Sequence, residues 1–241
     1  MAYTPIDKSS DYFNTVIYSG NGGTQSITSL DFQPDFLWGK QRNVSQDHVL
    51  IDSIRGTTKQ LYSSDTSAEQ TNTTGVTSFN SDGFSLGSSG YFNNGSNTYV
   101  AWNWKAGTSF TNDASATGIG TIDSTGSFNN DAGFSIVTYT GSGSNPATIK
   151  HGLNIVPKVI LLKKRTGASA LSWKVYVEAL GNTKYLILNG TEAEASDTSI
   201  WDSTTPTSSV FTVGSSDTNN TDDYVAYCFA EKQGYSKFGS Y

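Results

Sequence analysis

Large and small side chains alternate along Tyr99–Gly107, and a similar alternation returns at Tyr224–Lys232. A two-residue period with many aromatic residues predicts a β-strand in both places. In the first segment, Trp102 and Trp104 fall on the bulky side of the strand. We expect this side to face the core, because aromatic side chains bury the most area. An exposed platform that stacks on sugars or nucleic-acid bases is the alternative.

Other segments also recur in the same order along the two halves of the chain. The pairs are residues 13–22 with 134–143, 32–42 with 155–165, 56–59 with 181–184, and 84–87 with 211–214. The offset drifts from about 121 to about 127 positions, as loop insertions would produce. We therefore predict an internal duplication in which Trp102 and Trp104 are equivalent to Tyr227 and Phe229. Each unit of about 100 residues has the size of a small β-sandwich.

The fold class that we predict is all-β, with two tandem antiparallel β-sandwich repeats that resemble jelly rolls. Short apolar runs between turn residues predict strands near residues 13–19, 25–28, 36–40, 48–52, 59–62, 77–80, 84–86, 159–162, 173–177 and 185–188. The predicted domains are an N-terminal arm (1–12), repeat one (13–107), a Ser/Thr/Gly/Asn-rich linker with partial strand character (108–132), and repeat two (133–241). Residues 235–241 are expected to add an extra strand to repeat two.

The composition narrows the class of protein. Only 15% of the residues are charged and the net charge is −6, so the chain offers no basic surface for a nucleic-acid backbone. The one basic run, Lys163–Arg165, is expected to be a solvated strand end. The single cysteine, Cys228, cannot form a disulfide within the chain. Met1–Lys8 does not have the pattern of a secretory signal, and no apolar stretch has the length of a membrane span, so we expect a soluble protein made in a cytoplasm.

Catalytic chemistry has little support in the sequence. The two histidines, His48 and His151, occupy non-matching positions of the two repeats, and no nucleophile, zinc or phosphate-loop motif is present. The acidic residues of Asp217–Asp223 fit no calcium-loop spacing. We therefore predict no catalytic residues, no metal and no cofactor. A pair of glycosidase carboxylates stays open as an alternative, because any two acidic groups at a suitable separation could serve.

Four residues are candidates for ligand contact. Trp201 and Asp202 place an aromatic ring beside a carboxylate in a predicted loop, as some sugar sites do. Tyr91 and Phe92 lie in a Gly/Asn-rich loop of repeat one. The alternative for each aromatic residue is that it anchors its loop to the core.

Several long motifs together resemble a known family. They are residues 13–22, 99–107, 207–214 and 224–241. In this order they are similar to a repeat domain of unassigned function in predicted tail-fibre and other virion proteins of marine tailed bacteriophages, cyanophages among them. The resemblance covers nearly the whole chain. It implies a virion protein and carries no catalytic signature.

Three functional hypotheses follow. The first is a structural protein of a tailed-phage virion, either a tail fibre, another appendage or a capsid decoration subunit, which contacts the host surface. The second is a lectin-like module for a host cell-surface glycan, and the third is a polysaccharide depolymerase, which the sparse titratable residues make the weakest. We expect other virion proteins as partners and a homo-oligomer, with a trimer favoured by analogy with phage fibres. Nucleic acid and membrane insertion are not expected.

Overall fold

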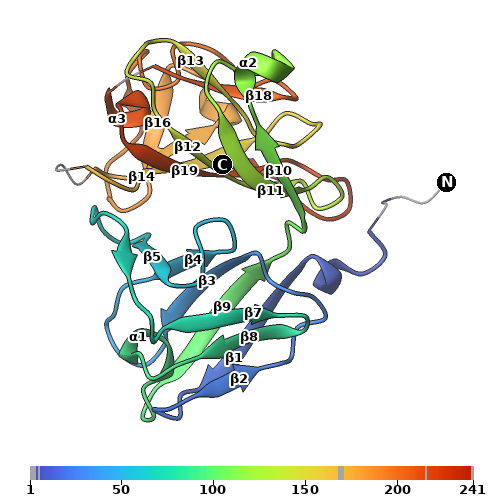
Figure 1. Cartoon of the computed structure of the whole chain (residues 1–241), viewed down its shortest axis with the longest axis vertical. Helices are drawn as coiled ribbons and strands as arrows, with labels where there is room; N and C mark the ends of the chain where they lie inside the picture. The colour runs from blue at the N-terminus through green and yellow to red at the C-terminus, as the bar shows by residue number, and fades with distance from the viewer. Residues whose placement is uncertain (1–3, 5, 168–170, 215, 240–241) are drawn as a thin grey trace. The chain divides into compact units, whose positions relative to one another are not determined.

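The structure is a computed structural model that describes residues 4, 6–167, 171–214 and 216–239. The chain divides into two compact units (Figure 1). The N-terminal unit is Asp7–Gly107, and the C-terminal unit is Thr108–Tyr241 together with Met1–Ile6. Every sheet consists of antiparallel strands. The predicted all-β character is therefore confirmed.

The N-terminal unit contains a six-stranded sheet in the order β1-β9-β3-β4-β5-β6 and a three-stranded sheet in the order β2-β8-β7. Its strands are β1 (Phe13–Ser19), β2 (Gln25–Ile27), β3 (Phe36–Gln41), β4 (Val49–Asp52), β5 (Lys59–Tyr62), β6 (Gln70–Thr71), β7 (Val76–Asn80), β8 (Gly83–Leu86) and β9 (Thr98–Trp104). A short 3-10 helix, η1 (Ser9–Asp11), precedes β1, and one helical turn, α1 (Gly90–Asn93), precedes β9.

The C-terminal unit contains an eight-stranded sheet in the order β10-β11-β12-β19-β14-β15-β16-β17 and a pair formed by β13 and β18. Its strands are β10 (Thr108–Asn112), β11 (Ser124–Asn129), β12 (Phe134–Thr140), β13 (Ala147–Lys150), β14 (Val159–Lys164), β15 (Lys174–Val177), β16 (Lys184–Ile187), β17 (Ala195–Ser196), β18 (Val210–Val213) and β19 (Asp223–Phe229). Its helical turns are α2 (Ala114–Thr117), η2 (Glu178–Leu180) and α3 (Ser216–Asn219). The predicted linker thus contributes β10 and β11 to this sheet.

The central strands of the two units pair in the same register. In the N-terminal unit β9 lies between β1 and β3, and in the C-terminal unit β19 lies between β12 and β14, where β3 and β14 each follow a proline. The matching pairs are Phe13–Trp104, Tyr18–Tyr99 and Phe36–Trp104 in one unit, and Phe134–Phe229, Tyr139–Tyr224 and Val159–Phe229 in the other. Trp102 and Tyr227 consequently hold equivalent positions.

The orientation of β9 is the reverse of the prediction. Tyr99, Ala101 and Asn103 are buried, whereas Trp102 and Trp104 are only partly buried. Ala101 belongs to the cluster of buried side chains that both sheets of the unit contribute. The centre of a two-layer core leaves little depth beneath the middle strand, so the small side chains point inward and the indoles point out.

In β19 the small side chains also belong to the core cluster. Ala226 and Cys228 pack there with the buried ring of Tyr224. The bulky side differs from that of β9, because Tyr227 is fully buried beneath Trp173. The outer face of the sheet is therefore covered in the C-terminal unit.

Two further expectations are wrong. Of the predicted strand at 235–241, residues 240 and 241 lie outside the described residues, and residues 235–239 form no strand: a turn at Gly234 closes back on Lys232, and Phe238 packs on Phe229. The Phe238 side chain packs on the face of the sheet, and the segment does not extend the edge of the sheet. Lys163 and Lys164 are not solvated but buried within β14, where the Lys163 ammonium group donates to the Leu171 carbonyl and Lys164 forms an ion pair with Asp222.

Candidate functional site

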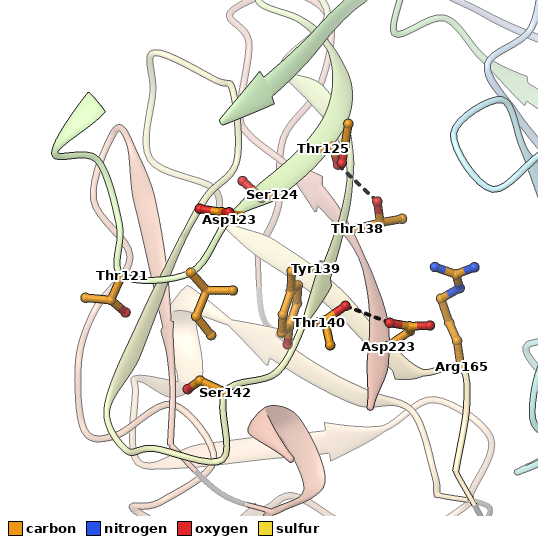
Figure 2. A pocket seen from close by; sticks show the side chains of 11 residues that line it. Thr121, Asp123, Ser124, Thr125, Thr138, Tyr139, Thr140, Ser142, Arg165 and Asp223 are labelled. Atoms are coloured by element: carbon orange, nitrogen blue, oxygen red, sulfur yellow. Dashed lines mark hydrogen bonds between the residues drawn. The ribbon is translucent and has the colours of Figure 1, made fainter. Parts of the chain in front are cut away.

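A polar pocket of about 640 Å³ opens on the C-terminal unit (Figure 2). Its walls come from the segment that leads into β11, from β11 and β12, and from the ends of β14 and β19. The lining residues are Thr121, Ile122, Asp123, Ser124, Thr125, Thr138, Tyr139, Thr140, Ser142, Arg165 and Asp223. Most of them carry a hydroxyl, a carboxylate or a guanidinium group.

A two-residue period brings these side chains to one surface. Thr121, Asp123 and Thr125 alternate with the buried side chains of Ile122 and Ser124. The partner strand shows the same alternation in Thr138, Thr140 and Ser142 around the buried Tyr139. Because successive side chains of a strand point to opposite faces, the two polar series meet where β11 pairs with β12. The polar pocket is thus a direct product of the strand pattern.

Charged groups border the polar pocket on two sides. Asp223, at the start of β19, accepts a hydrogen bond of 2.7 Å from the Thr140 hydroxyl, as Figure 2 shows. The backbone carbonyl oxygen of Asp223 accepts a 2.7 Å hydrogen bond from the backbone N–H of Arg165. This hydrogen bond positions the backbone from which the Arg165 side chain extends. Asp123 accepts a 2.8 Å hydrogen bond from the backbone N–H of Ala114, at the N-terminus of α2.

This arrangement suits the binding of a polyhydroxylated ligand better than catalysis. Both carboxylates already accept hydrogen bonds from the chain itself, Asp123 from the Ala114 N–H and Asp223 from the Thr140 hydroxyl. Hydroxyl, carboxylate and guanidinium groups offer donors and acceptors for ligand hydroxyls. Within the described parts of the chain no group of three or more His, Cys, Asp or Glu side chains could hold a metal ion.

A second feature lies in the N-terminal unit, on the outer face of its six-stranded sheet. We call it the aromatic face; it consists of Phe13, Trp38, His48, Trp102 and Trp104, which line an apolar pocket of about 310 Å³. All five side chains are partly exposed. Phe13 and Trp104 hold their ring centroids 4.7 Å apart.

His48 is the polar member of the aromatic face. Its Nδ1 accepts a hydrogen bond from the indole N–H of Trp38 at 3.3 Å. The pKa of His48 is lowered, mainly by partial burial and further by the Lys40 ammonium group, while Asp47 opposes this shift. The aromatic face therefore carries a neutral imidazole at neutral pH.

Two of the four candidate ligand residues are inaccessible. Trp201 is 1% exposed, packs edge-on against Tyr176, and donates its indole N–H to the Lys184 carbonyl at 3.2 Å. Phe92 is also 1% exposed and belongs to the core of the N-terminal unit. The structure contradicts the expectation that these two rings meet a ligand, because both fill the space beneath their loops.

The other two candidates, Tyr91 and Asp202, are partly exposed and stay predictions. Tyr91 leans on Tyr62, with ring centroids 5.7 Å apart. Asp202 has a left-handed backbone, with φ of 48°, in the turn after Trp201. The two residues belong to different units, so the candidates do not form one site within either unit.

The sequence reasoning missed the polar pocket, although a signal was present. Thr121, Asp123 and Thr125 alternate with apolar or small residues, and so do Thr138 and Thr140. Two neighbouring segments with such a polar face indicate a polar surface where they pair. The Ser/Thr/Gly/Asn-rich composition of residues 108–132 predicts a linker and does not by itself indicate a site. The alternation of β9 predicts that Trp102 and Trp104 face the core, whereas both line the aromatic face.

The remaining reactive side chains are structural. His151 is buried, and its imidazole nitrogens contact the Thr207 carbonyl and the Leu153 N–H. Burial lowers the pKa of His151 to about 4. Burial raises the pKa of the Cys228 thiol to about 12, which removes its thiolate at neutral pH.

Comparisons with known proteins give a family without a described activity. No curated protein and no solved structure matches the chain. None of the helices in the described residues is long and apolar enough to cross a membrane. The model of a domain of unknown function, DUF7483, matches residues 8–241. The match spans both units, and the chain therefore belongs to the DUF7483 family.

Proposed function

We propose that the chain is a structural protein of a tailed-bacteriophage virion, built from two tandem jelly-roll-like β-sandwiches, that contacts the host surface. The observation that carries the proposal is the shared register of the two units, which supports a repeated module. The motif resemblance to marine phage virion proteins gives the setting: a tail fibre, an appendage or a capsid decoration assembled in the host cytoplasm. A map of the assembled particle tests this, and a chain absent from purified particles would end it.

Binding of a host-surface glycan is the second candidate function, and the polar pocket favours it. Its side chains present hydroxyls, two carboxylates and a guanidinium group over a volume within the range of ligand pockets. Asp223→Ala and Arg165→Ala should each weaken adsorption of the purified chain to host envelope polysaccharide. Lys59→Ala, at a partly exposed position of the other unit, is the matched control. Equal adsorption by all variants would rule out this pocket.

A depolymerase ranks last among the candidates. The carboxylates of the polar pocket already accept hydrogen bonds, and neither histidine lies beside them in the lining. We expect no release of oligosaccharides when the purified chain is incubated with host envelope polysaccharide. Release that a single Asp or Glu substitution abolishes would overturn this expectation.

We also propose that the chain forms a homo-oligomer, and we favour a trimer by analogy with phage fibres. The first strand of the N-terminal unit, β1, lies at the edge of its sheet, and Ile17 on it is 63% exposed. The equivalent strand β12 is paired on that side by β11. An open edge invites a strand from another copy. Light scattering should show that Ile17→Lys lowers the oligomer mass, whereas removal of residues after Gly234 should not. A wild-type monomer that makes no subunit contacts in the particle would refute the proposal.

A further inference from the structure

The two units differ at one equivalent position on the outer face of the main sheet. His48 directly precedes β4, and Trp173 directly precedes β15. The strands that follow pair in the same register, with Val49 opposite Gly39 and Lys174 opposite Leu162. Trp173 thus stands in the C-terminal unit where His48 stands in the N-terminal unit.

In the C-terminal unit the chain covers this face with its own indole. Trp173 is fully buried and lies nearly parallel to Tyr227, with an interplanar angle of 22° and ring centroids 6.2 Å apart. The Lys163 ammonium group donates to the Leu171 carbonyl, and the Asn189 side-chain oxygen accepts a hydrogen bond from the Trp173 backbone N–H at 2.9 Å. These contacts hold a flat ring over the middle strand.

In the N-terminal unit the corresponding loop does not cross the face. It has seven residues, 42–48, against nine residues, 165–173, in the other unit. Lys40, the equivalent of Lys163, donates to the carbonyls of Gln41 and Val44 at 2.7 and 3.3 Å, which holds the loop near the end of β3. Trp102 consequently stays partly exposed.

The chemical groups of the aromatic face indicate which class of ligand it can bind. The pocket is lined by ring carbon, its histidine is neutral, and the nearby Lys40 ammonium group already binds carbonyls. The net charge of −6 disfavours polyanions. Among the described residues the large apolar side chains in the most exposed class are Ile17 and Val44, and neither carries an aromatic ring that could take the place of Trp173.

We propose that the aromatic face binds a neutral pyranose, whose apolar C–H face stacks on the exposed indoles at the position that Trp173 occupies in the other unit. The volume of about 310 Å³ lies at the lower end of ligand pockets and suits a short saccharide. Thr15, opposite Trp102 on the neighbouring strand, and His48 supply polar groups at the rim. The inference rests on the proposed function only for the source of the sugar, a host-surface glycan.

The test uses intrinsic tryptophan fluorescence of the purified full chain. Trp173 and Trp201 are buried, so quenching by a ligand reports Trp38, Trp102 and Trp104. The probes are neutral hexasaccharides of glucose, mannose and galactose, with dextran sulfate as the polyanion. We expect saturable quenching by at least one neutral hexasaccharide and none by dextran sulfate.

Three variants locate the site. Trp102→Ala should weaken binding at least tenfold. His48→Trp, which places an indole where Trp173 covers the sheet in the other unit, should abolish binding. Tyr235→Ala removes a partly exposed aromatic ring of the other unit and should leave binding unchanged. Circular dichroism and thermal unfolding verify that each variant is folded; if Trp102→Ala does not fold, His48→Trp decides.

The outcomes separate this inference from the proposed function. Absence of saturable quenching by every neutral hexasaccharide, in a chain that is found in virions, overturns the inference and leaves the proposed function standing. Binding that both Trp102→Ala and His48→Trp leave unchanged also overturns it. A fall in oligomer mass with Trp102→Ala, without sugar binding by the wild type, would instead identify the aromatic face as a contact between copies.

Discussion

Two buried asparagines, Asn93 and Asn219, hold equivalent turns closed in the two units. The Asn93 amide group donates to the carbonyls of Gly23 and Gly87, and its oxygen accepts from the Asn21 N–H. The Asn219 amide group donates to the Ser144 carbonyl, and its oxygen accepts from the Ser142 N–H. A buried amide that is fully hydrogen-bonded positions a loop without leaving a polar group unpaired. These contacts were not visible in the sequence, because several asparagines surround each one.

A pH dependence of stability is expected from His151. Its pKa is about 4 in the folded chain, because burial disfavours the charged ring, against about 6.5 when unfolded. The unfolded state therefore binds the proton first as the pH falls. The free energy of unfolding should be unaffected by this group above pH 6.5 and should drop by about 3 kcal/mol between pH 6.5 and 4.

Urea unfolding at a series of pH values measures this dependence. His151→Gln should remove much of the loss between pH 6.5 and 4, whereas His48→Gln, at a half-buried position, should retain most of it. The same steep loss in His151→Gln and wild type would show that other groups are responsible.

At the scale of elements, the strand pattern gave most strands but not their faces or all of their neighbours. The alternation around Tyr99 and Tyr224 correctly placed β9 and β19. The linker was expected to pair at a sheet edge, and β10 and β11 do so. The C-terminal segment is predicted as a strand because residues 238–241 resemble the opening of a further repeat, yet Phe238 packs on the sheet face. A local resemblance of this kind does not distinguish an apolar residue in a strand from one in a turn that packs on a sheet.

The glycines that directly follow β1 and β12, Gly20 and Gly141, are expected to be intolerant of a side chain. A Cβ on Gly141 would lie 1.8 Å from the Asn220 carbonyl oxygen, and one on Gly20 would lie 2.2 Å from that of Asn94. Gly141→Ala should lower the free energy of unfolding by about 1–3 kcal/mol, because the Asn220 backbone would have to move to make room for the new methyl group. Gly90→Ala has no neighbour within 4 Å and serves as the control in chemical denaturation. Equal stability of the two variants would contradict the expectation.

At the scale of the whole molecule, each unit has its own cluster of buried side chains. The core of the N-terminal unit includes Leu37, and that of the C-terminal unit includes Leu162. Each core gathers side chains from both sheets of its own unit. We therefore expect the loss of packing in one core to leave the other intact.

Hydrogen exchange read by mass spectrometry tests this independence. Leu162→Ala should destabilise its unit by about 2–5 kcal/mol, through the cavity that it leaves. Protection should fall in β12, β14 and β19 and remain unchanged in β1, β3 and β9. Leu37→Ala should give the opposite pattern. Loss of protection in both units from either substitution would show that they unfold together.

The sequence alone determined that the chain is all-β and where most strands run, and it predicted that the segments of β1, β3 and β9 match those of β12, β14 and β19, which pair in the same register. Strand periodicity and turn residues are local properties, so they can be read without a structure. Only the tertiary structure decided which side of β9 faces the core and which outer face is covered. Both faces of that strand are apolar enough to be buried. The choice depends on the depth beneath the opposing sheet and on whether a loop, as at Trp173 but not at His48, reaches across the face.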